Sequence, residues 1–334
     1  MAGSFAQCDI VVPVYGQAAY TKGCVDSIRT HTTVPFRLII VDDASVETAT
    51  IEYLKELSVR EARVRVLRQD QNRGYVDAVN LGLKNTAAEF VVVMNNDTVV
   101  YPGWLEEMIV VAGQDPQIGI VNPEWEVPRE FGSDTARYVK QDISARHGEF
   151  METDWARGFC YLTKRCVIDR IGGLDRDFAP AYYDDWDYSL RAAAAGYRCA
   201  RALGAFVYHF RNVTYSTNSS GQTSALLQQK GQVFYKRWGK PLNLLVIDDG
   251  RSPDIEEKIL VLLRDQNRVM VISPRVGLRH TNLKVIRVPR WLSGLASAVV
   301  LLDDARHSPR KRFHLVIRDF RAVERTIKEL KFGP

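Results

Sequence analysis

The sequence IIVDDAS, at residues 39–45, runs from three apolar β-branched residues directly into two aspartates and a short turn. Such a run is typical of a buried strand that ends in a loop. In a sheet of parallel strands, ligands bind outside the carboxyl ends of the strands. We therefore expect Asp43 to face a ligand and Asp42 to orient the loop, although paired aspartates also cap helices and form ordinary turns.

The first 115 residues repeat this pattern. Strands are expected at 9–14, 36–41, 64–68 and 90–94, and helices at 18–30, 48–57 and 74–83. The alternation predicts a Rossmann-like α/β fold with a mostly parallel sheet. Polar residues follow each strand where a ligand would lie, at residues 13–15, 42–45, 72–74 and 95–97.

The later chain divides at Gly239-Lys240-Pro241, because proline cannot continue the helix expected at 224–238. Upstream of this boundary, the alternation of strand and helix patterns becomes irregular from about residue 117 to 181. It then indicates a helix at 183–195 and a strand at 201–207. We expect one domain at residues 1–240 and a smaller α/β domain of unassigned role at residues 241–334.

The smaller domain is expected to hold strands at 242–247, 268–272, 283–287, 297–302 and 312–317, with helices at 254–264 and 319–330. Two of these strands are expected to end in paired aspartates, Asp248-Asp249 and Asp303-Asp304. They are open to a phosphate-binding, nucleotide-binding or receiver-like interpretation. The absence of a glycine-rich phosphate loop beside either pair favours a structural or docking role.

The composition argues against a disordered or fibrous protein. The 334 residues are 46% hydrophobic and 25% charged, which is the balance of a globular protein. The five cysteines are odd in number and show no zinc spacing, which favours a reduced, intracellular protein. Neither a signal peptide nor an apolar run of about 18 residues is evident. We expect a cytoplasmic protein, and nothing in the sequence indicates its oligomeric state.

The net charge of +5 owes much to basic residues late in the chain, including Arg306, Arg310, Lys311 and Arg312. A basic face could contact anionic lipid at the inner face of a membrane, or an acceptor that carries pyrophosphate. An ordinary solvated surface explains the same residues equally well.

Two acidic motifs carry the chemistry. Asn95-Asn96-Asp97 ends an apolar strand, and Asp97 suits a hard divalent cation, which takes oxygen ligands and keeps several waters. Asp184, Asp185 and Asp187 lie within four residues, and such crowding raises a carboxyl pKa and suits a general base. Asp187 can pair with Arg191 one helical turn away, which leaves Asp185 as the base.

The chain resembles family 2 of the glycosyltransferases, with the GT-A fold, over about residues 8–240. The resemblance rests on several motifs in order, each weak alone: VVPVY at 11–15, VDDAS at 41–45, NRG at 72–74 with Asn80 and Gly82, NND at 95–97, WARG at 155–158, and DDWD at 184–187 with Arg191 and Gly196. The sequence departs from the family pattern at Asn95, an acidic position in the family, and at Asp184, usually a glutamate.

The resemblance implies roles for individual residues. Asp43 would read the base of a nucleotide sugar, Asp97 would hold Mg²⁺ or Mn²⁺, and Asp185 would deprotonate the acceptor hydroxyl. His209 follows the strand after this helix and is either a further metal ligand or a packed, hydrogen-bonded histidine. The other expected donor-binding residues are Pro13, Tyr15, Arg73, Asn95 and Asn96, with a simple Asx turn as the alternative for Asn95. The expected acceptor-binding residues are Trp155, Arg157, Gly158, Asp184 and Trp186, with core packing as the alternative for each aromatic.

The expected activity is that of an inverting, metal-dependent, hexosyltransferase-type glycosyltransferase. It would move a sugar from a UDP- or dTDP-linked donor to a saccharide or lipid-linked saccharide in cell-surface polysaccharide or glycan synthesis. The main alternative is a catalytically silent module that binds nucleotide sugars and assembles other enzymes. A nucleotidyltransferase is disfavoured, because it would need a glycine-rich basic loop after the first strand and the sequence has none there. Nucleic-acid binding is disfavoured as well, because the acidic strand ends would repel the phosphates.

Overall fold

The computed structural model describes residues 8–210, 220–289, 292–306, 312–320 and 323–332. The chain divides into two compact units, the first made of residues 1–151 and 155–233 and the second of 152–154 and 234–334. This division falls within helix α8 (Ser220–Trp238). The sequence-based domain limits at residue 240 stay a prediction.

The first unit is built on a large sheet whose first half is parallel. Its strands pair in the order β3-β2-β1-β4, with register positions such as Val14 opposite Asp42. Their carboxyl ends therefore meet at one edge, as the expected α/β fold requires. The strands are β1 (Cys8–Val14), β2 (Phe36–Asp42), β3 (Val64–Arg68) and β4 (Phe90–Met94).

The second half of this sheet is mixed. Strand β8 (Cys160–Lys164) runs antiparallel to β4, and β5 (Thr98–Val100) runs antiparallel to the end of β9 (Arg198–His209). Strands β6 (Ile118–Glu124) and β7 (Phe150–Thr153) complete it. Because Thr98 lies opposite His209, residues 97 and 209 meet at the edge that carries the polar strand ends.

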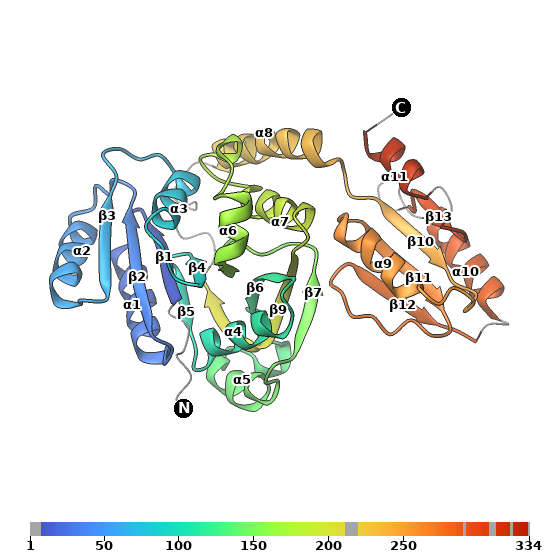
Figure 1. Ribbon diagram of the computed structural model, residues 1–334, viewed down its shortest axis with the longest axis horizontal. Coiled ribbons are helices and arrows are strands. Elements are labelled where there is room, and N and C mark those ends of the chain that lie inside the picture. The colour runs from blue at the N-terminus through green and yellow to red at the C-terminus, as the bar shows by residue number, and fades with distance from the viewer. Residues whose placement is uncertain (1–7, 211–219, 290–291, 307–311, 321–322, 333–334) are drawn as a thin grey trace. The chain divides into compact units, whose positions relative to one another are not determined.

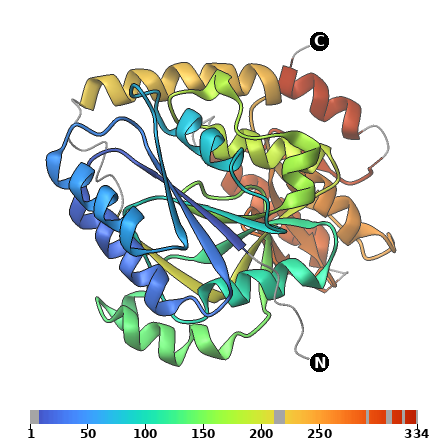
Figure 2. The same cartoon turned by 60° about the vertical axis from the view of Figure 1, so that its left-hand side comes forward.

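Helices cover both faces of this sheet (Figures 1 and 2). One core includes residues of α1 (Ala18–His31), α2 (Thr48–Arg60) and α4 (Trp104–Gln114), and the other includes residues of α3 (Tyr75–Leu83), α6 (Arg165–Ile171) and α7 (Asp184–Ala194). Strand residues alternate between the two cores: Ile10 and Val12 face the first and Val11 the second. The remaining helices are the short α5 (Thr135–Gln141) and three single turns at 129–131, 143–145 and 176–178.

Helix α3 approaches the sheet unusually closely at Gly82. A Cβ atom at this position would lie 2.2 Å from Cγ1 of Val11 on β1. The missing side chain thus lets α3 lie directly on the strand. This contact places the start of α3 beside the carboxyl ends of β1 and β2.

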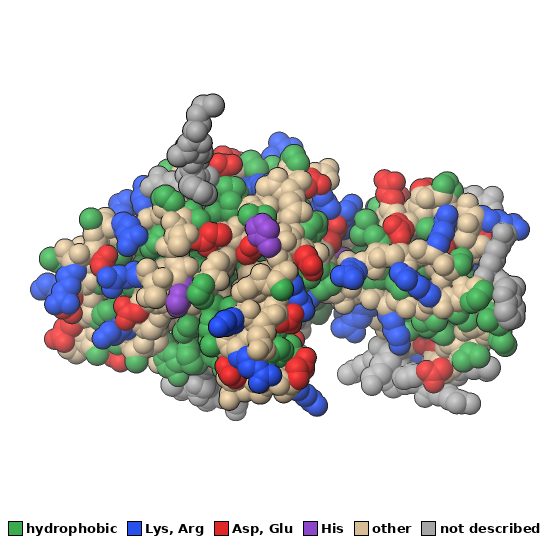
Figure 3. All heavy atoms as spheres, turned by 90° about the horizontal axis from the view of Figure 1, so that it is seen from below, with side chains coloured by type: hydrophobic (Ala, Val, Ile, Leu, Met, Phe, Trp, Pro, Cys, Tyr) green, Lys and Arg blue, Asp and Glu red, His purple; other side chains and the backbone are tan. Residues whose placement is uncertain are grey.

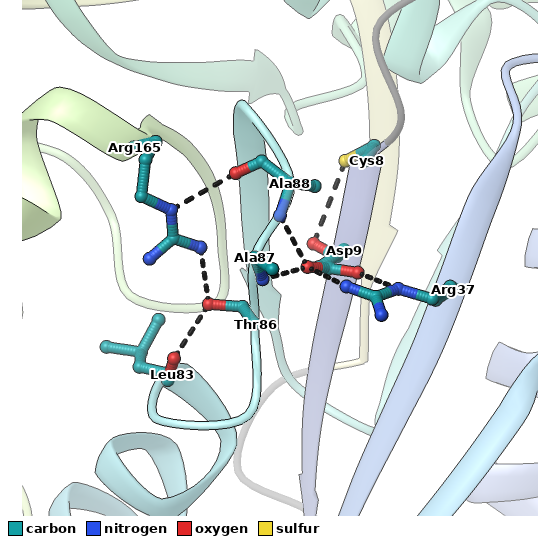
Figure 4. A network of polar contacts seen from close by, with 8 residues as sticks. All are labelled: Cys8, Asp9, Arg37, Leu83, Thr86, Ala87, Ala88 and Arg165. Carbon is teal, nitrogen blue, oxygen red and sulfur yellow. Dashed lines mark hydrogen bonds and ion pairs between the residues drawn. The ribbon is translucent and has the colours of Figure 1, made fainter.

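A buried carboxylate, Asp9, anchors the opposite, amino edge of the sheet (Figure 4). It accepts two hydrogen bonds from Arg37 on β2, at 2.7 and 2.8 Å, and one each from the main-chain N–H groups of Ala87 and Ala88, at 2.7 and 2.9 Å. Arg165 donates to the carbonyl of Ala88 at 3.2 Å. Asp9 therefore fixes β1, β2 and the turn before β4 at one point.

The second unit is a parallel sheet in the order β12-β11-β10-β13. Its strands are β10 (Asn243–Ile247), β11 (Arg268–Ser273), β12 (Leu283–Arg287) and β13 (Leu315–Ile317). Its helices are α9 (Ile255–Arg264), α10 (Ser293–Arg306) and α11 (Val323–Phe332). The expected α/β fold of the smaller domain is confirmed.

One expected strand of this unit is wrong. Residues 297–302 lie inside helix α10, where Ser297 is buried while Leu295 and Val299 are 64% and 59% exposed. A short apolar run does not distinguish a strand from a buried helix by periodicity. Asp303 and Asp304 consequently lie in the last turn of a helix and do not end a strand.

The possible peripheral membrane contact stays a prediction. None of the helices within the described ranges is long and apolar enough to cross a bilayer. Arg310 and Lys311 lie outside the described residues. On the face in Figure 3, basic and acidic side chains are intermixed and do not form a field of one sign.

We predict that Asp9→Asn lowers the free energy of unfolding by about 2 kcal/mol at neutral pH. This is less than the full penalty for breaking a buried ion pair, because Arg37 is 43% exposed and water screens it. Burial alone would raise the pKa of Asp9, but the hydrogen bonds from Arg37, Ala88 and Ala87 hold it below the ordinary aspartate value. The ionised Asp9 carboxylate therefore makes its full contribution to the free energy of unfolding above the ordinary aspartate pKa of about 4. This contribution is lost as the pH falls through the lowered pKa of the folded state.

Urea unfolding of the natural chain and the variant over a pH series checks this prediction. The stability difference should be constant near neutrality and shrink below about pH 4. Asp26→Asn, at an exposed position on α1, is the control. A difference that persists unchanged in acid would contradict the role of the Asp9 carboxylate.

Candidate functional site

The loop after β2 is held by Asp42. One carboxylate oxygen accepts from the main-chain N–H of Ser45 at 2.9 Å, and the other pairs with Arg68 on β3. Ala44 has a φ of 58°, so the chain turns sharply through the left-handed region between them. Asp42 is 2% exposed and orients this loop, as the sequence suggested.

Asp43 ties that loop to the start of α3. It accepts from Nε2 of Gln69 at 2.7 Å and from the main-chain N–H groups of Arg73 and Gly74, each at 2.8 Å. Burial raises its pKa above the usual value, and the two main-chain bonds partly offset that rise. A carboxylate has about four lone-pair positions, so about one remains for a ligand.

Gly74 joins this loop to a distant part of the chain. Its φ of 86° is open to glycine alone, and a Cβ atom there would lie 2.3 Å from Cβ of Pro180. The N–H of Val76 donates to the carbonyl of Pro180 at 3.1 Å. The loop at 72–74 therefore packs against the segment that leads into α7.

Asp97 and His209 meet as the β5–β9 pairing requires. Asp97 is 5% exposed, and its Oδ1 lies 3.2 Å from Nε2 of His209. The amide of Asn95 lies 3.5 Å from the same ring nitrogen, whereas Asn96 donates to Thr21 at 2.9 Å and faces α1. Asp97 and His209 thus form a preassembled oxygen–nitrogen pair that could bind a divalent cation.

Asp185 lies at the start of α7 and is held by main-chain donors. Its Oδ2 accepts from the N–H of Gly158 at 2.7 Å, and its Oδ1 accepts from the N–H of Trp186 at 2.8 Å. The Ser189 hydroxyl links the same turn to the segment that precedes β8 by accepting from the N–H of Ala156 at 2.9 Å. The carboxylate is therefore fixed before any ligand binds.

The neighbouring Asp184 is 5% exposed and has no room for a hydration shell. Burial raises the pKa of Asp184, and the charge of Asp185 raises it further. Burial also raises the pKa of Asp185, against the lowering effect of the N–H groups of Gly158 and Trp186 and of the Arg157 charge. This pair has the environment of a general acid–base site. Asp187 pairs with Arg191 at 2.7 Å and is structural, as expected.

The chain enters α7 through two strained residues. Tyr182 and Tyr183 have φ values of 78° and 64°, which cost non-glycine residues on the order of 1–3 kcal/mol each. The ring of Tyr183 stacks on Trp186, with centroids 5.9 Å apart and planes at 6°. Trp186 in turn stacks on Trp155 at 5.0 Å, and the guanidinium of Arg157 covers Trp155 at 4.1 Å. An aromatic wall therefore stands beside Asp185.

Residues 157–159 connect the two acidic groups. Gly158 donates to Asp185, whereas the carbonyl of Phe159 accepts from the N–H of Asn95 at 2.8 Å. The ring of Phe159 also stacks on His209, with centroids 4.9 Å apart and planes at 13°. One short segment thus places the Asp185 carboxylate and the Asp97–His209 pair at a common edge.

Two of the residues expected in the site take no part in the hydrogen bonds described above. Pro13 is buried within β1 opposite Val41, and Tyr15 lies beyond the strand end, 40% exposed. Conversely, Gln69 and Tyr75 were not anticipated. Tyr75 donates to the carbonyl of Gly158 at 3.0 Å, and its position directly after NRG was the only available signal. Gln69 depends on the β2–β3 register, which the sequence does not reveal.

Comparison with known proteins gives a consistent result. Residues 9–160 match the family model described as glycosyl transferase family 2. Over 247 residues, the chain is 26% identical to the uncharacterized protein y4gI of Sinorhizobium fredii, a match that covers 69% of this chain and 27% of that protein. It is 27% identical to the uncharacterized glycosyltransferase YwdF of Bacillus subtilis (59% and 73% covered) and 27% identical to the O-antigen biosynthesis protein RfbC of Myxococcus xanthus (75% and 22% covered).

Two solved structures share the fold. One is the mannosyltransferase PcManGT of Pyrobaculum calidifontis in complex with GDP-Man and Mn²⁺, at 18% identity, a TM-score of 0.55, and coverage of 92% of this chain and 78% of that one. The other is GalNAc-T7 with UDP, GalNAc and Mn²⁺, at 15% identity, a TM-score of 0.51, and coverage of 62% and 44%. The expected GT-A fold is confirmed.

We predict that Gly74→Ala destabilises the first unit by about 1–3 kcal/mol, because it forces a side chain into a glycine-only conformation against Pro180. Gly113→Ala is the matched control: it lies on α4 with no heavy atom within 4 Å of a new Cβ, and should be neutral or slightly stabilising. Urea unfolding midpoints check both. Equal effects would show that the contact with Pro180 does not constrain the loop.

Proposed function

Because residues 9–160 match the model of glycosyl transferase family 2, we propose that the chain is an inverting glycosyltransferase. It would transfer a hexose from a UDP- or dTDP-linked donor to a saccharide or lipid-linked saccharide acceptor. The observation that carries this proposal is the buried Asp185 carboxylate, held by Gly158 at the same edge as Asp97 and His209. A relative named for O-antigen biosynthesis supports assigning the product to cell-surface polysaccharide.

The donor is proposed to lie along the ends of β1, β2 and β4. Asp43 has about one free lone-pair position for an N–H of the base, and the side chain of the neighbouring Arg73, which pairs with Asp70, is 39% exposed. Asn95 and Asn96 would stand beside the ribose, with Asn95 the better placed because Asn96 already bonds to Thr21. Tyr15 and Pro13 would border the base from β1.

The residues present fit a divalent cation. Asp97 offers a buried carboxylate oxygen and His209 a ring nitrogen. Among the described residues, no cluster of three or more His, Cys, Asp or Glu side chains could hold a metal. Mg²⁺ or Mn²⁺ bound here would fill its other positions with water and donor phosphates, and would neutralise the leaving diphosphate.

Asp185 would act as the base. It takes the proton of the acceptor hydroxyl while that oxygen forms a bond to the anomeric carbon of the donor sugar and the bond to the diphosphate breaks. Attack opposite the leaving group inverts the configuration and needs no enzyme nucleophile. Burial raises the pKa of Asp185, and the neighbouring Asp184 has its own pKa raised by burial and by the charge of Asp185.

The aromatic wall would bind the acceptor. Trp155 and Trp186 are stacked beside Asp185, and Arg157 covers the outer face of Trp155. Because Trp186 and Arg157 already lie over Trp155, an acceptor sugar would pack its C–H groups against the edges of this stack, and the guanidinium would donate hydrogen bonds to its hydroxyls. Gly158 would contribute by aiming the Asp185 carboxylate.

We predict that Asp97→Asn and His209→Ala each weaken Mn²⁺ binding by about tenfold or more, because each removes one of few protein ligands. Titration followed by the electron paramagnetic resonance signal of free Mn²⁺ measures this directly, without a substrate. Asp169→Asn, at an exposed position on α6, is the control. Binding that survives both substitutions would place the cation elsewhere.

We predict that Asp185→Asn lowers kcat for transfer by about 10²–10⁴-fold while donor affinity changes less than about twofold. The isosteric amide can still accept from Gly158, so the fold should persist. Product release from a panel of UDP- and dTDP-sugars, and donor binding by calorimetry, separate the two effects. Because burial raises the pKa of Asp185, activity should fall on acidification at a higher pH than an ordinary aspartate would give. Unchanged kcat in the variant would refute the base assignment, and donor binding without turnover by the natural chain would favour the silent module.

A further inference from the structure

An open cavity of about 660 Å³ lies beside His209, between the β5–β9 edge and the segment at 125–135. Its size falls in the range of about 300–1,000 Å³ that is typical of ligand pockets. His209 lines the cavity and also contacts Asp97, so the cavity opens next to the candidate cation site. None of the roles assigned above uses it.

The lining indicates the chemistry of the occupant. Tyr101, Trp125, Tyr208 and Phe210 contribute four aromatic rings, and Ser133 and Thr135 contribute hydroxyls. Glu126 is the one acidic residue, and neither Lys nor Arg is present among the described lining residues. A phosphate or nucleotide would find no cationic side chain among these described lining residues, whereas a neutral polyhydroxyl ligand would find aromatic surfaces for its C–H groups and hydroxyl partners for its hydrogen bonds.

Two of these rings are unusually open to solvent. Tyr208 is 36% exposed and Phe210 is 45% exposed, and they meet edge to face at 5.1 Å. Large aromatic rings left exposed beside a cavity mark a binding surface more often than a packing defect.

The cavity connects to the base through side chains. Trp125 on its wall lies 5.6 Å from the guanidinium of Arg157, which covers Trp155 at 4.1 Å. Trp155 stacks on Trp186, the residue after Asp185. A continuous wall of aromatic and guanidinium groups therefore runs from Asp185 to the cavity, while His209 borders it on the cation side.

We propose that this cavity is an extension subsite that binds a second sugar residue of the acceptor, next to the residue whose hydroxyl reacts. The inference rests on the proposed transferase function. It makes the preferred acceptor an oligosaccharide or glycoside of at least two sugar residues, and assigns Tyr208 and Phe210 as its stacking platform.

The test uses acceptors of increasing length. Aryl glycosides with one, two and three hexose residues are assayed with each UDP- or dTDP-sugar that the natural chain turns over. We expect kcat/KM to rise about tenfold from one residue to two, the effect of one good stacked contact, about 1.4 kcal/mol. Ser133→Trp, which fills the cavity from an exposed loop position, and Tyr208→Ser should each abolish most of that rise.

Donor hydrolysis in the absence of acceptor is the internal control, because neither Ser133 nor Tyr208 is among the residues proposed to bind the donor or the cation. It should stay within about twofold in both variants. Ser58→Trp, at an exposed position near the end of α2, controls for adding a surface tryptophan. A length-dependent rise that survives Ser133→Trp and Tyr208→Ser, or no rise in the natural chain, would overturn the subsite.

Failure of the proposed function looks different. The natural chain would then release no nucleoside diphosphate from any donor, whatever the acceptor. A glycan array probed with the natural chain and Ser133→Trp still tests whether the cavity binds a saccharide. Binding lost only in the variant supports a saccharide site, and no binding or equal binding refutes it.

Discussion

The antiparallel pairing of β8 with β4 is the constraint on which the candidate site depends. It sets Cys160 opposite Met94, so the residues just before β8 arrive at the edge where β4 ends. Gly158 and Phe159 then contact Asp185 on one side and Asn95 and His209 on the other. A parallel strand in this place would deliver its carboxyl end to the edge and would need a long crossover to return. The candidate base Asp185 and the candidate cation ligands Asp97 and His209 are close together because β8 runs antiparallel to β4.

The polar groups at this edge are immobilised mainly by backbone donors. Asp43 and Asp185 each accept from main-chain N–H groups of segments distant in the sequence, at Arg73, Gly74 and Gly158. A main-chain donor has no rotamer freedom to lose, so a carboxylate held this way is already ordered when a ligand arrives. The same bonds consume lone pairs, which restricts each carboxylate to one or two further partners.

Much of this arrangement could be predicted from the sequence, because it follows from local patterns. IIVDDAS and the NND motif each end an apolar run, and the parallel sheet then brings Asp43 and Asp97 to one edge. Contacts set by register or by long-range packing could not. Gln69 reaches Asp43 only through the β2–β3 pairing, and the Trp125–Arg157 contact joins parts of the chain that have no common motif. Residues 297–302 were misassigned because six apolar and small residues carry no usable period, and the buried Ser297 of α10 emerges only in three dimensions.

The segment between β6 and β7 packs with Phe206 of β9 around a small core, formed by Tyr138, Val139, Ile143 and Phe206. This core is separate from the two that support the sheet and its helices. Trp125 at the start of the segment packs against the first of those cores, whereas Val127 and Phe131 pack on the small one, so mutations at 127–145 act mainly on packing that does not hold Asp43, Asp97 and Asp185. Under the proposed function, a change in that segment would alter which acceptor is preferred while leaving the packing around Asp43, Asp97 and Asp185 in place.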